Sequence, residues 1–160
     1  MLFAVRMTLA EKQQELVAQL ARCHGTTERL AWLVARARQQ RPLEAEFKTE
    51  AFRVEGCLAK LWLVAEGREG RCCFRCDSDS QVVKAVAGLL CEFYSGQAPA
   101  EVLAHDPAFL AAAGITQHLT PNRRNALARV WEKIRAFAEA YRDAGIPHPA
   151  SGIPHPPLCP

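Results

Sequence analysis

The apolar positions in the first quarter of the chain follow a helical period. They recur three or four positions apart between residues 9 and 20, and again between residues 30 and 37. Thr8 and Glu11 form the capping-box pattern that favours a helix start, and a helix rarely continues through the residue before Pro42. Because this spacing places apolar side chains on one face, it predicts two amphipathic helices before residue 43.

The pattern changes in the middle of the chain. Residues 43–56 lack clear periodicity and predict a loop with at most a short strand. The mostly apolar residues 58–65 form a run short enough for a buried strand, and residues 71–76 predict a returning strand. Gly67 and Gly70 are expected to bracket the turn between them, so these residues predict a β-hairpin.

Helical spacing returns after the hairpin. Apolar residues between positions 82 and 93 form one face, and short helices are expected between residues 99 and 113. Thr120 and Pro121 have the pattern of a helix start, and apolar positions from 127 to 141 follow at core spacing. The order of these elements predicts an α+β fold in which helices pack on a small antiparallel sheet.

The expected domain boundaries follow from a change in composition. Residues 8–142 carry the periodic pattern and predict one domain, with residues 1–7 as an N-terminal extension. Residues 143–160 repeat the motif Gly-Ile-Pro-His-Pro and contain too many prolines for a helix or a strand ladder, so a disordered tail is expected. Weak metal binding by this tail stays open as the less favoured alternative, and the residues concerned are His148, His155 and Cys159.

Composition and charge narrow the classes of function. Apolar residues make up 49% of the 160 residues, which is ordinary for one globular domain. The net charge of +3 is small and the basic residues are scattered, so nucleic acid is not an expected partner. No apolar run reaches the roughly 20 residues of a membrane-spanning helix, and residues 1–6 are too short for a secretory signal. A cytoplasmic protein without a membrane partner is expected, with Met7 as an alternative start.

Cysteine is the residue type that carries most of the chemical information. Seven cysteines are an odd number, and a chain of this length folds without a disulfide framework. In a reducing cytoplasm they are core residues, metal ligands or reactive thiols. Cys57 follows Gly56, which permits a tight backbone that projects a thiol from a loop. Taken alone, this pattern is explained more often by a buried cysteine without chemistry.

Four segments beginning just before Cys57 occur in the order and spacing of a known family. They are Arg53-Val54-Glu55-Gly56-Cys57 with Leu61-Trp62-Leu63-Val64, then Asp77-Ser78-Asp79, then Tyr94-Ser95-Gly96, and finally Thr116-Gln117-His118-Leu119-Thr120-Pro121-Asn122-Arg123-Arg124-Asn125. Through these four segments the chain resembles the SufE/CsdE family of sulfur-acceptor proteins over residues 8–140. The resemblance implies a SufE/IscU-like fold and makes Cys57 the sulfur acceptor. At residues 58–60 the chain carries Leu-Ala-Lys where family members often have polar residues.

The resemblance also implies a mechanism. A partner cysteine desulfurase of the SufS or CsdA type uses pyridoxal phosphate to remove sulfur from free cysteine and holds it as a persulfide. Cys57 takes the terminal sulfur, the desulfurase is stimulated, and an iron–sulfur scaffold such as a SufBCD-type complex receives the sulfur. Exchange of this kind needs an accessible sulfur and an attacking thiolate. The chain itself is expected to need no cofactor and no metal, and to be a carrier rather than a stand-alone enzyme.

Three residues are candidates for supporting Cys57. Arg123 starts the last predicted helix, where its charge could favour an anionic sulfur, and a solvated arginine is an equal alternative. His118 could move a proton or donate to the persulfide, although a histidine before a helix more often binds loop backbone. Asp77 could contact the desulfurase, and capping of the helix that follows is its more favoured role.

A second cysteine cluster is the main alternative site. Cys73-x-x-Cys76 matches a zinc or redox spacing, and Cys57 or a histidine could complete a metal site. In a strand, however, residues 73 and 76 point to opposite faces. Two alternative functions therefore stay open: a metal or iron–sulfur scaffold, and a thiol oxidoreductase in which Cys72, Cys73 or Cys76 resolves a disulfide with Cys57.

Overall fold

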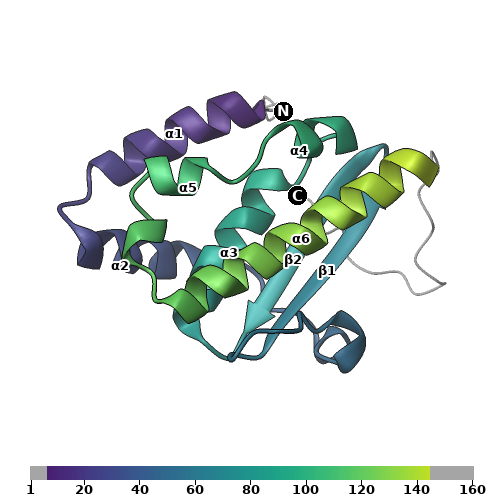
Figure 1. The fold of residues 1–160 in the computed structure, drawn as a ribbon, viewed down its shortest axis with the longest axis horizontal. Helices are drawn as coiled ribbons and strands as arrows, with labels where there is room; N and C mark the ends of the chain where they lie inside the picture. Colours follow the sequence, from purple (N-terminus) through teal and green to yellow (C-terminus); the bar gives the residue numbers. More distant parts are fainter. Residues whose placement is uncertain (1–6, 145–160) are drawn as a thin grey trace.

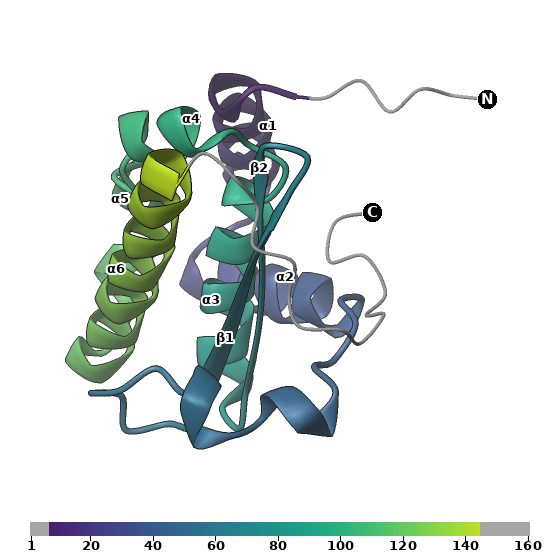
Figure 2. The same ribbon diagram turned by 90° about the vertical axis from the view of Figure 1, so that its right-hand side faces the viewer.

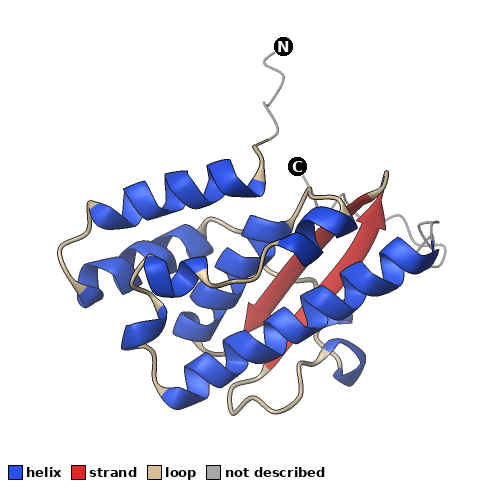
Figure 3. Ribbon diagram, turned by 45° about the horizontal axis from the view of Figure 1, so that its top comes forward, coloured by secondary structure: helices blue, strands red, loops and turns tan. Residues whose placement is uncertain are grey.

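The computed structural model describes residues 7–144, in which helices pack against one β-hairpin (Figures 1 and 3). The elements in chain order are α1 (Leu9–Ala21), α2 (Thr26–Arg38), the 3₁₀ turns η1 (Ala45–Phe47) and η2 (Glu50–Phe52), β1 (Leu61–Arg68), β2 (Arg71–Ser78), α3 (Gln81–Tyr94), α4 (Pro99–Ala104), α5 (Phe109–Ala112), the 3₁₀ turn η3 (Thr116–His118) and α6 (Pro121–Ala144). The predicted α+β fold class, with helices on a small antiparallel sheet, is confirmed.

The ends of the chain bear on two predictions. Residues 1–6 of the predicted extension lie outside the described residues, and so do residues 145–160 of the predicted tail, with its His148, His155 and Cys159. The last helix, α6, continues to Ala144, two residues past the predicted end of the domain. Within residues 7–144, none of the helices combines the length and the apolar composition that crossing a bilayer requires.

The first helix begins as its sequence predicts. The backbone N–H of Glu11 donates to Thr8 Oγ1 (3.2 Å), and the backbone N–H of Thr8 donates to Glu11 Oε2 (2.8 Å). This reciprocal pair satisfies two donors that a helix start leaves without partners. At α6 the hydroxyl of Thr120 accepts from the backbone N–H of Arg123 (3.4 Å), and Pro121 is the first helical residue.

The first strand lies three residues later than predicted. It was expected at residues 58–65, but β1 begins at Leu61, which is opposite Ser78 of β2. The backbone N–H of Val54 also donates to the Leu61 carbonyl (2.8 Å), so pairing on both sides fixes this start. As a result, Leu-Ala-Lys at 58–60 stays in the loop, and Cys57 stands outside the sheet.

Gly67 does not belong to the hairpin turn, so that part of the prediction is wrong. The turn is formed by Glu69 and Gly70, whose φ angles are 51° and 77°, as in two-residue hairpin turns with both φ angles positive. Gly67 lies within β1 under the ring of Tyr141, where an added Cβ would come within 2.6 Å of two ring carbons. Tyr141 Oη also accepts from the N–H of Gly70 (3.0 Å). Helix α6 therefore holds the turn end of the hairpin by direct contact.

One face of the hairpin packs against α3 and α6 and forms the core. Figure 2 shows the hairpin close to edge-on, with α6 on one side of it. Phe74 of β2 meets Phe137 of α6 edge to face, with ring centroids 5.8 Å apart. The apolar residues with no exposed surface are Leu61, Cys72, Leu90, Tyr94, Val102, Val130, Ile134 and Ala138. A two-stranded sheet is marginal by itself, so the helices stabilise the hairpin.

We predict that Gly67→Ala lowers the free energy of unfolding by about 1–3 kcal/mol, because the added methyl group overlaps the Tyr141 ring. Urea unfolding followed by circular dichroism measures this change. In a Tyr141→Ala background the same substitution should cost much less, since the ring is absent. An equal cost in both backgrounds would show that Tyr141 is not the cause.

Candidate functional site

Cys57 lies in a loop, residues 53–60, which is hereafter called the Cys57 loop. It joins η2 to β1 and lies at the end of the hairpin where β1 begins and β2 ends. Its first part runs beside β1, because Arg53 forms an isolated antiparallel bridge with Trp62 and the N–H of Val54 donates to the Leu61 carbonyl. Val54 is only 1% exposed. The start of the loop is therefore fixed to β1 by a buried residue, Val54.

The last residue of the loop is held by the end of β2. The N–H of Lys60 donates to Asp79 Oδ1 (2.9 Å), and the Lys60 carbonyl accepts from Ser78 Oγ (2.7 Å) and from the N–H of Asp79 (3.2 Å). Both polar groups of the Lys60 backbone are thus satisfied by the Asp-Ser-Asp segment. With Val54 at the other end, two fixed points bracket the short piece that carries Cys57.

Helix α6 holds the middle of the loop. Gly56 has a φ of 81°, a conformation that residues with a Cβ rarely adopt. Asn125 Nδ2 donates to the Gly56 carbonyl (2.7 Å), and an added Cβ at Gly56 would lie 3.1 Å from Arg129 Nε. Asn125 and Arg129 are four residues apart on one face of α6. The residue before Cys57 therefore sits directly against this helix.

The thiol of Cys57 is half-buried. It packs against the edge of the core, while the next residue, Leu58, is 82% exposed and is the one large apolar side chain in residues 7–144 with such exposure. Burial raises the pKa of Cys57, and the positive charge of Arg129 acts in the opposite direction. The site thus combines a partly accessible sulfur, a cation and an exposed apolar side chain.

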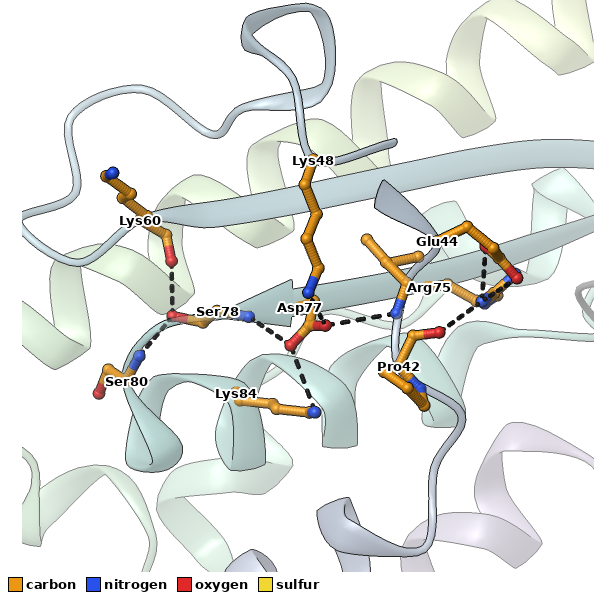
Figure 4. Close-up of polar contacts among 10 residues, drawn as sticks. Pro42, Glu44, Lys48, Lys60, Arg75, Asp77, Ser78, Ser80 and Lys84 are labelled. Atoms are coloured by element: carbon orange, nitrogen blue, oxygen red, sulfur yellow. Dashed lines mark hydrogen bonds and ion pairs between the residues drawn. The ribbon is translucent and has the colours of Figure 1, made fainter. Parts of the chain in front are cut away.

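Asp77 has a structural role inside the domain that differs from helix capping (Figure 4). Its carboxylate is buried, forms ion pairs with Lys48 (3.1 Å) and Lys84 (3.2 Å), and accepts from the backbone N–H groups of Leu43 (3.3 Å) and Ser78 (2.9 Å). The N-cap of α3 is instead Ser80, whose Oγ accepts from the N–H of Val83 (3.3 Å). The capping prediction for Asp77 is therefore wrong.

The contacts of Asp77 also determine its protonation. Burial disfavours the charged carboxylate, but the hydrogen bonds from Lys48, Ser78 and Lys84 outweigh burial and hold the pKa of Asp77 below its usual value. A side chain that is 4% exposed and bound in this way presents no free surface to a partner. Asp77 instead joins β2 to α3 and to the segment after α2.

Among residues 7–144, neither a hydrogen bond nor an ion pair joins Arg123 or His118 to Cys57. The backbone N–H of Arg123 belongs to the capped first turn of α6, and its side chain is half-buried. Arg123 and Asn125 are two positions apart, so their side chains leave different faces of the helix. His118 ends η3 and is exposed. A supporting role for either residue stays a prediction.

Asn125 and Arg129 are the site residues that sequence reasoning missed. Asn125 is the last residue of the segment 116–125, which resembles the family, but the sequence assigned it no role. Arg129 is one of several polar residues in the last predicted helix. Their four-residue spacing identifies a shared face. Which element that face meets depends on the tertiary fold, and the sequence alone gave no signal for it.

The alternative cysteine cluster is divided by the hairpin. Cys72 and Cys76 are buried, free thiols on the face toward the core, whereas Cys73 is buried on the opposite face, as expected for a strand. Cys72 is opposite Gly67, which lies six residues along β1 from Leu61. Six residues of a strand span about 20 Å, so Cys72 lies far along the hairpin from the end that carries the Cys57 loop. Burial raises the pKa of Cys72 to about 12.

Cys76 is nearer to the Cys57 loop but is engaged elsewhere. It contacts Cys91 of α3, and this hydrogen bond, together with burial, raises the pKa of the Cys91 thiol. Both thiols are less than 10% exposed. Within the described part of the chain, no group of three His, Cys, Asp or Glu residues lies close enough to hold a metal ion.

A broad surface depression is distant from this chemistry. A shallow groove of about 670 Å³ lies between α1 and α2, and its lining includes Arg22, Cys23, Trp32 and Arg36. None of the residues that line it belongs to the Cys57 loop or to α6. The groove therefore does not form part of the Cys57 site.

The fold and the site together define a small α+β domain that presents one cysteine from a clamped loop at the end of a β-hairpin. The SufE family, described as an Fe-S metabolism associated domain, matches residues 14–138. The chain therefore belongs to the SufE family.

Individual relatives agree with this assignment. A SufE-like protein of Synechocystis is 27% identical over 135 residues, which cover 84% of this chain and 85% of that protein. SufE-like protein 1, chloroplastic/mitochondrial, of Arabidopsis thaliana is 33% identical over 120 residues, or 74% of this chain and 32% of that protein. The chain thus matches about a third of the length of the plant relative.

A solved structure has the same fold. The solution structure of a hypothetical protein from Thermus thermophilus superposes with a TM-score of 0.67 at 22% identity. The match covers 86% of this chain and 99% of that one. At this level of identity the likeness concerns the arrangement of helices and hairpin.

We predict that Asp77→Asn lowers the free energy of unfolding at pH 7 by about 3 kcal/mol, because it removes the charge that Lys48 and Lys84 face. The folded pKa of Asp77 is depressed, so this stabilisation is complete above about pH 4 and is lost as the pH falls through the folded pKa. Urea unfolding at several pH values measures the difference between wild type and variant.

Asp143→Asn is the matched control, since the ion pair of Asp143 with Arg142 is exposed. The control should change stability by less than about 0.5 kcal/mol. A difference for Asp77→Asn that stays constant from pH 7 down to pH 2 would contradict the electrostatic explanation.

Proposed function

We propose that this chain is a sulfur carrier that accepts persulfide sulfur on Cys57 from a cysteine desulfurase. One observation carries the proposal: a half-exposed thiol stands in a loop that is fixed at both ends, beside an exposed leucine. Membership of the SufE family, which is associated with iron–sulfur metabolism, supports the same chemistry.

The proposed transfer is an exchange at sulfur in which atoms and electrons balance. The thiolate of Cys57 attacks the terminal sulfur of the donor persulfide, and a new S–S bond forms on Cys57. The S–S bond of the donor breaks, and its electron pair leaves with the donor sulfur as a thiolate. No external oxidant or reductant is consumed, because the transferred sulfur keeps its oxidation state.

The environment of Cys57 fits a carrier that reacts on docking. Burial raises the pKa of the thiol, so the resting sulfur is largely protonated near neutral pH. A protonated thiol reacts slowly with small oxidants, because the thiolate is the nucleophile. The fixed ends of the loop limit the entropy that must be lost when a partner positions the sulfur.

Leu58 is the proposed contact with the partner. An isolated exposed leucine is normal on a protein surface, but here it adjoins the reacting residue. The chain has this apolar residue where the family often has a polar one. A complementary apolar surface around the donor sulfur would bury Leu58 and bring Cys57 with it.

The remaining parts of the pathway belong to the partners. The pyridoxal phosphate is on the desulfurase, of SufS or CsdA type, which this chain stimulates by removing its sulfur. A scaffold of iron–sulfur assembly, such as a SufBCD-type complex, receives the sulfur. The reducing cytoplasm is the proposed location, because a persulfide and free thiols persist there.

We predict that wild-type protein incubated with a SufS-type desulfurase and free cysteine gains the mass of one sulfur on Cys57, and that mild reduction removes it. Cys57→Ser should gain none, because the accepting sulfur is absent. Intact mass followed by peptide mapping measures both results. Cys23→Ser, which removes another half-exposed thiol, is the control and should be labelled like wild type. Equal labelling of Cys57→Ser and wild type would overturn the assignment.

We predict that Leu58→Ser slows sulfur transfer from the desulfurase by about tenfold, because an apolar contact of that size is lost at the interface. Stability should change little, since Leu58 is exposed. Labelling of Cys57 by a small polysulfide, which needs no docking surface, should remain normal. A variant that is slow with both donors would indicate damage to the loop instead.

A further inference from the structure

Arg129 approaches the Cys57 loop more closely than its exposed position on α6 would suggest. Its Nε, Cζ and Nη2 atoms lie 3.1, 3.6 and 3.6 Å from the point that a Cβ of Gly56 would occupy. One turn earlier, Asn125 binds the Gly56 carbonyl. The guanidinium therefore lies against the residue that precedes Cys57, in a space that exists because residue 56 has no side chain.

The charges around the loop are of both signs. They are Arg53 (which pairs with Glu50), Glu55 and Lys60 in the loop itself, Asp79 just after β2, and Arg129 and Glu132 on α6. Arg129 is the charged group, among those that the structure describes, that shifts the pKa of Cys57, and it opposes the larger effect of burial. Arg129 also forms an ion pair with Glu132 (3.1 Å), which shares its charge.

Resting on the proposed function, we propose that Arg129 is a positioning residue that sets the reactivity of Cys57, and that Glu132 moderates it. The geometry that supports this is the contact of the guanidinium with Gly56 and the ion pair one helical turn further along.

Two anionic forms of sulfur occur in the transfer, and Arg129 favours both. The thiolate of Cys57 is the attacking form, and the persulfide is held as an anion after the donor thiolate leaves. A nearby cation stabilises each anion over its protonated form. Arg129 and Glu132 are about half exposed, so solvent partly screens their charges. We therefore expect a moderate effect on the reactivity of Cys57.

The test measures how fast iodoacetamide alkylates Cys57 in the full chain, from about pH 6 to pH 10, which spans the usual range of thiol titration. Mass spectrometry of the peptide that contains Cys57 separates this thiol from the others. The variants are Arg129→Gln, Arg129→Lys and Glu132→Gln. The matched control is Arg135→Gln, which removes the same charge six residues further along α6, where Arg135 pairs with Glu139.

Removal of the positive charge of Arg129 and removal of the negative charge of Glu132 should change the alkylation rate of Cys57 in opposite directions. At neutral pH the alkylation of Arg129→Gln falls by about threefold and its pH profile shifts upward. Arg129→Lys, which keeps the charge, stays close to wild type, and Glu132→Gln reacts faster. Arg135→Gln is unchanged. A wild-type profile for Arg129→Gln, an equal shift for Arg135→Gln, or slower alkylation of Glu132→Gln would each overturn the inference.

This experiment uses no desulfurase, so its failure differs from the failure of the proposed function. If Cys57 accepts sulfur but Arg129→Gln titrates like wild type, the carrier function stands and the role of Arg129 is wrong. If the profile shifts as expected but Cys57 takes no sulfur from a desulfurase, the electrostatic role stands and the carrier function is wrong.

Discussion

The structure around Cys57 depends on the buried carboxylate of Asp77. This one side chain binds Lys48, Lys84 and the backbone of Leu43, and so joins α3 and the segment after α2 to the end of β2 (Figure 4). The two residues that follow it, Ser78 and Asp79, hold Lys60 at the end of the Cys57 loop. A buried charge is tolerated only when its partners are complete, which makes this junction specific as well as stable. The loop that presents the thiol is built on that junction.

Most of the helices could be predicted because their signals are local. The capping box at Thr8 and the Thr-Pro start of α6 are patterns of neighbouring residues. The strand boundary was misplaced because Leu58 is apolar in sequence but exposed in the fold, and the true start at Leu61 is set by residues 54 and 78. Gly67 was misassigned for a similar reason, since the ring that requires it comes from Tyr141.

The candidate site shows the same division between local and distant causes. Cys57 could be found from its own segment, through Gly56 and the family resemblance. Asn125 and Arg129 could not, because their contacts with Gly56 span 69 residues or more. Asp77 was the predicted cap of α3, but Ser80 takes that role and Asp77 is buried among Lys48, Lys84 and the backbone of Leu43. Long-range packing, rather than propensity, decided each of these cases.

The burial of the thiols determines what their rates of reaction with a thiol reagent measure. Cys72, Cys76 and Cys91 are closed off by the contact between the hairpin and α3, whereas Cys57 and Cys23 reach the surface in part. A thiol reagent therefore meets the interior sulfurs only when the hairpin separates from α3, an opening that costs much of the free energy of unfolding. The slow reaction of the interior thiols measures cooperative opening, and the fast reaction of Cys57 measures its local environment. The natural cysteines of one chain thus provide two separate kinetic probes without any added label.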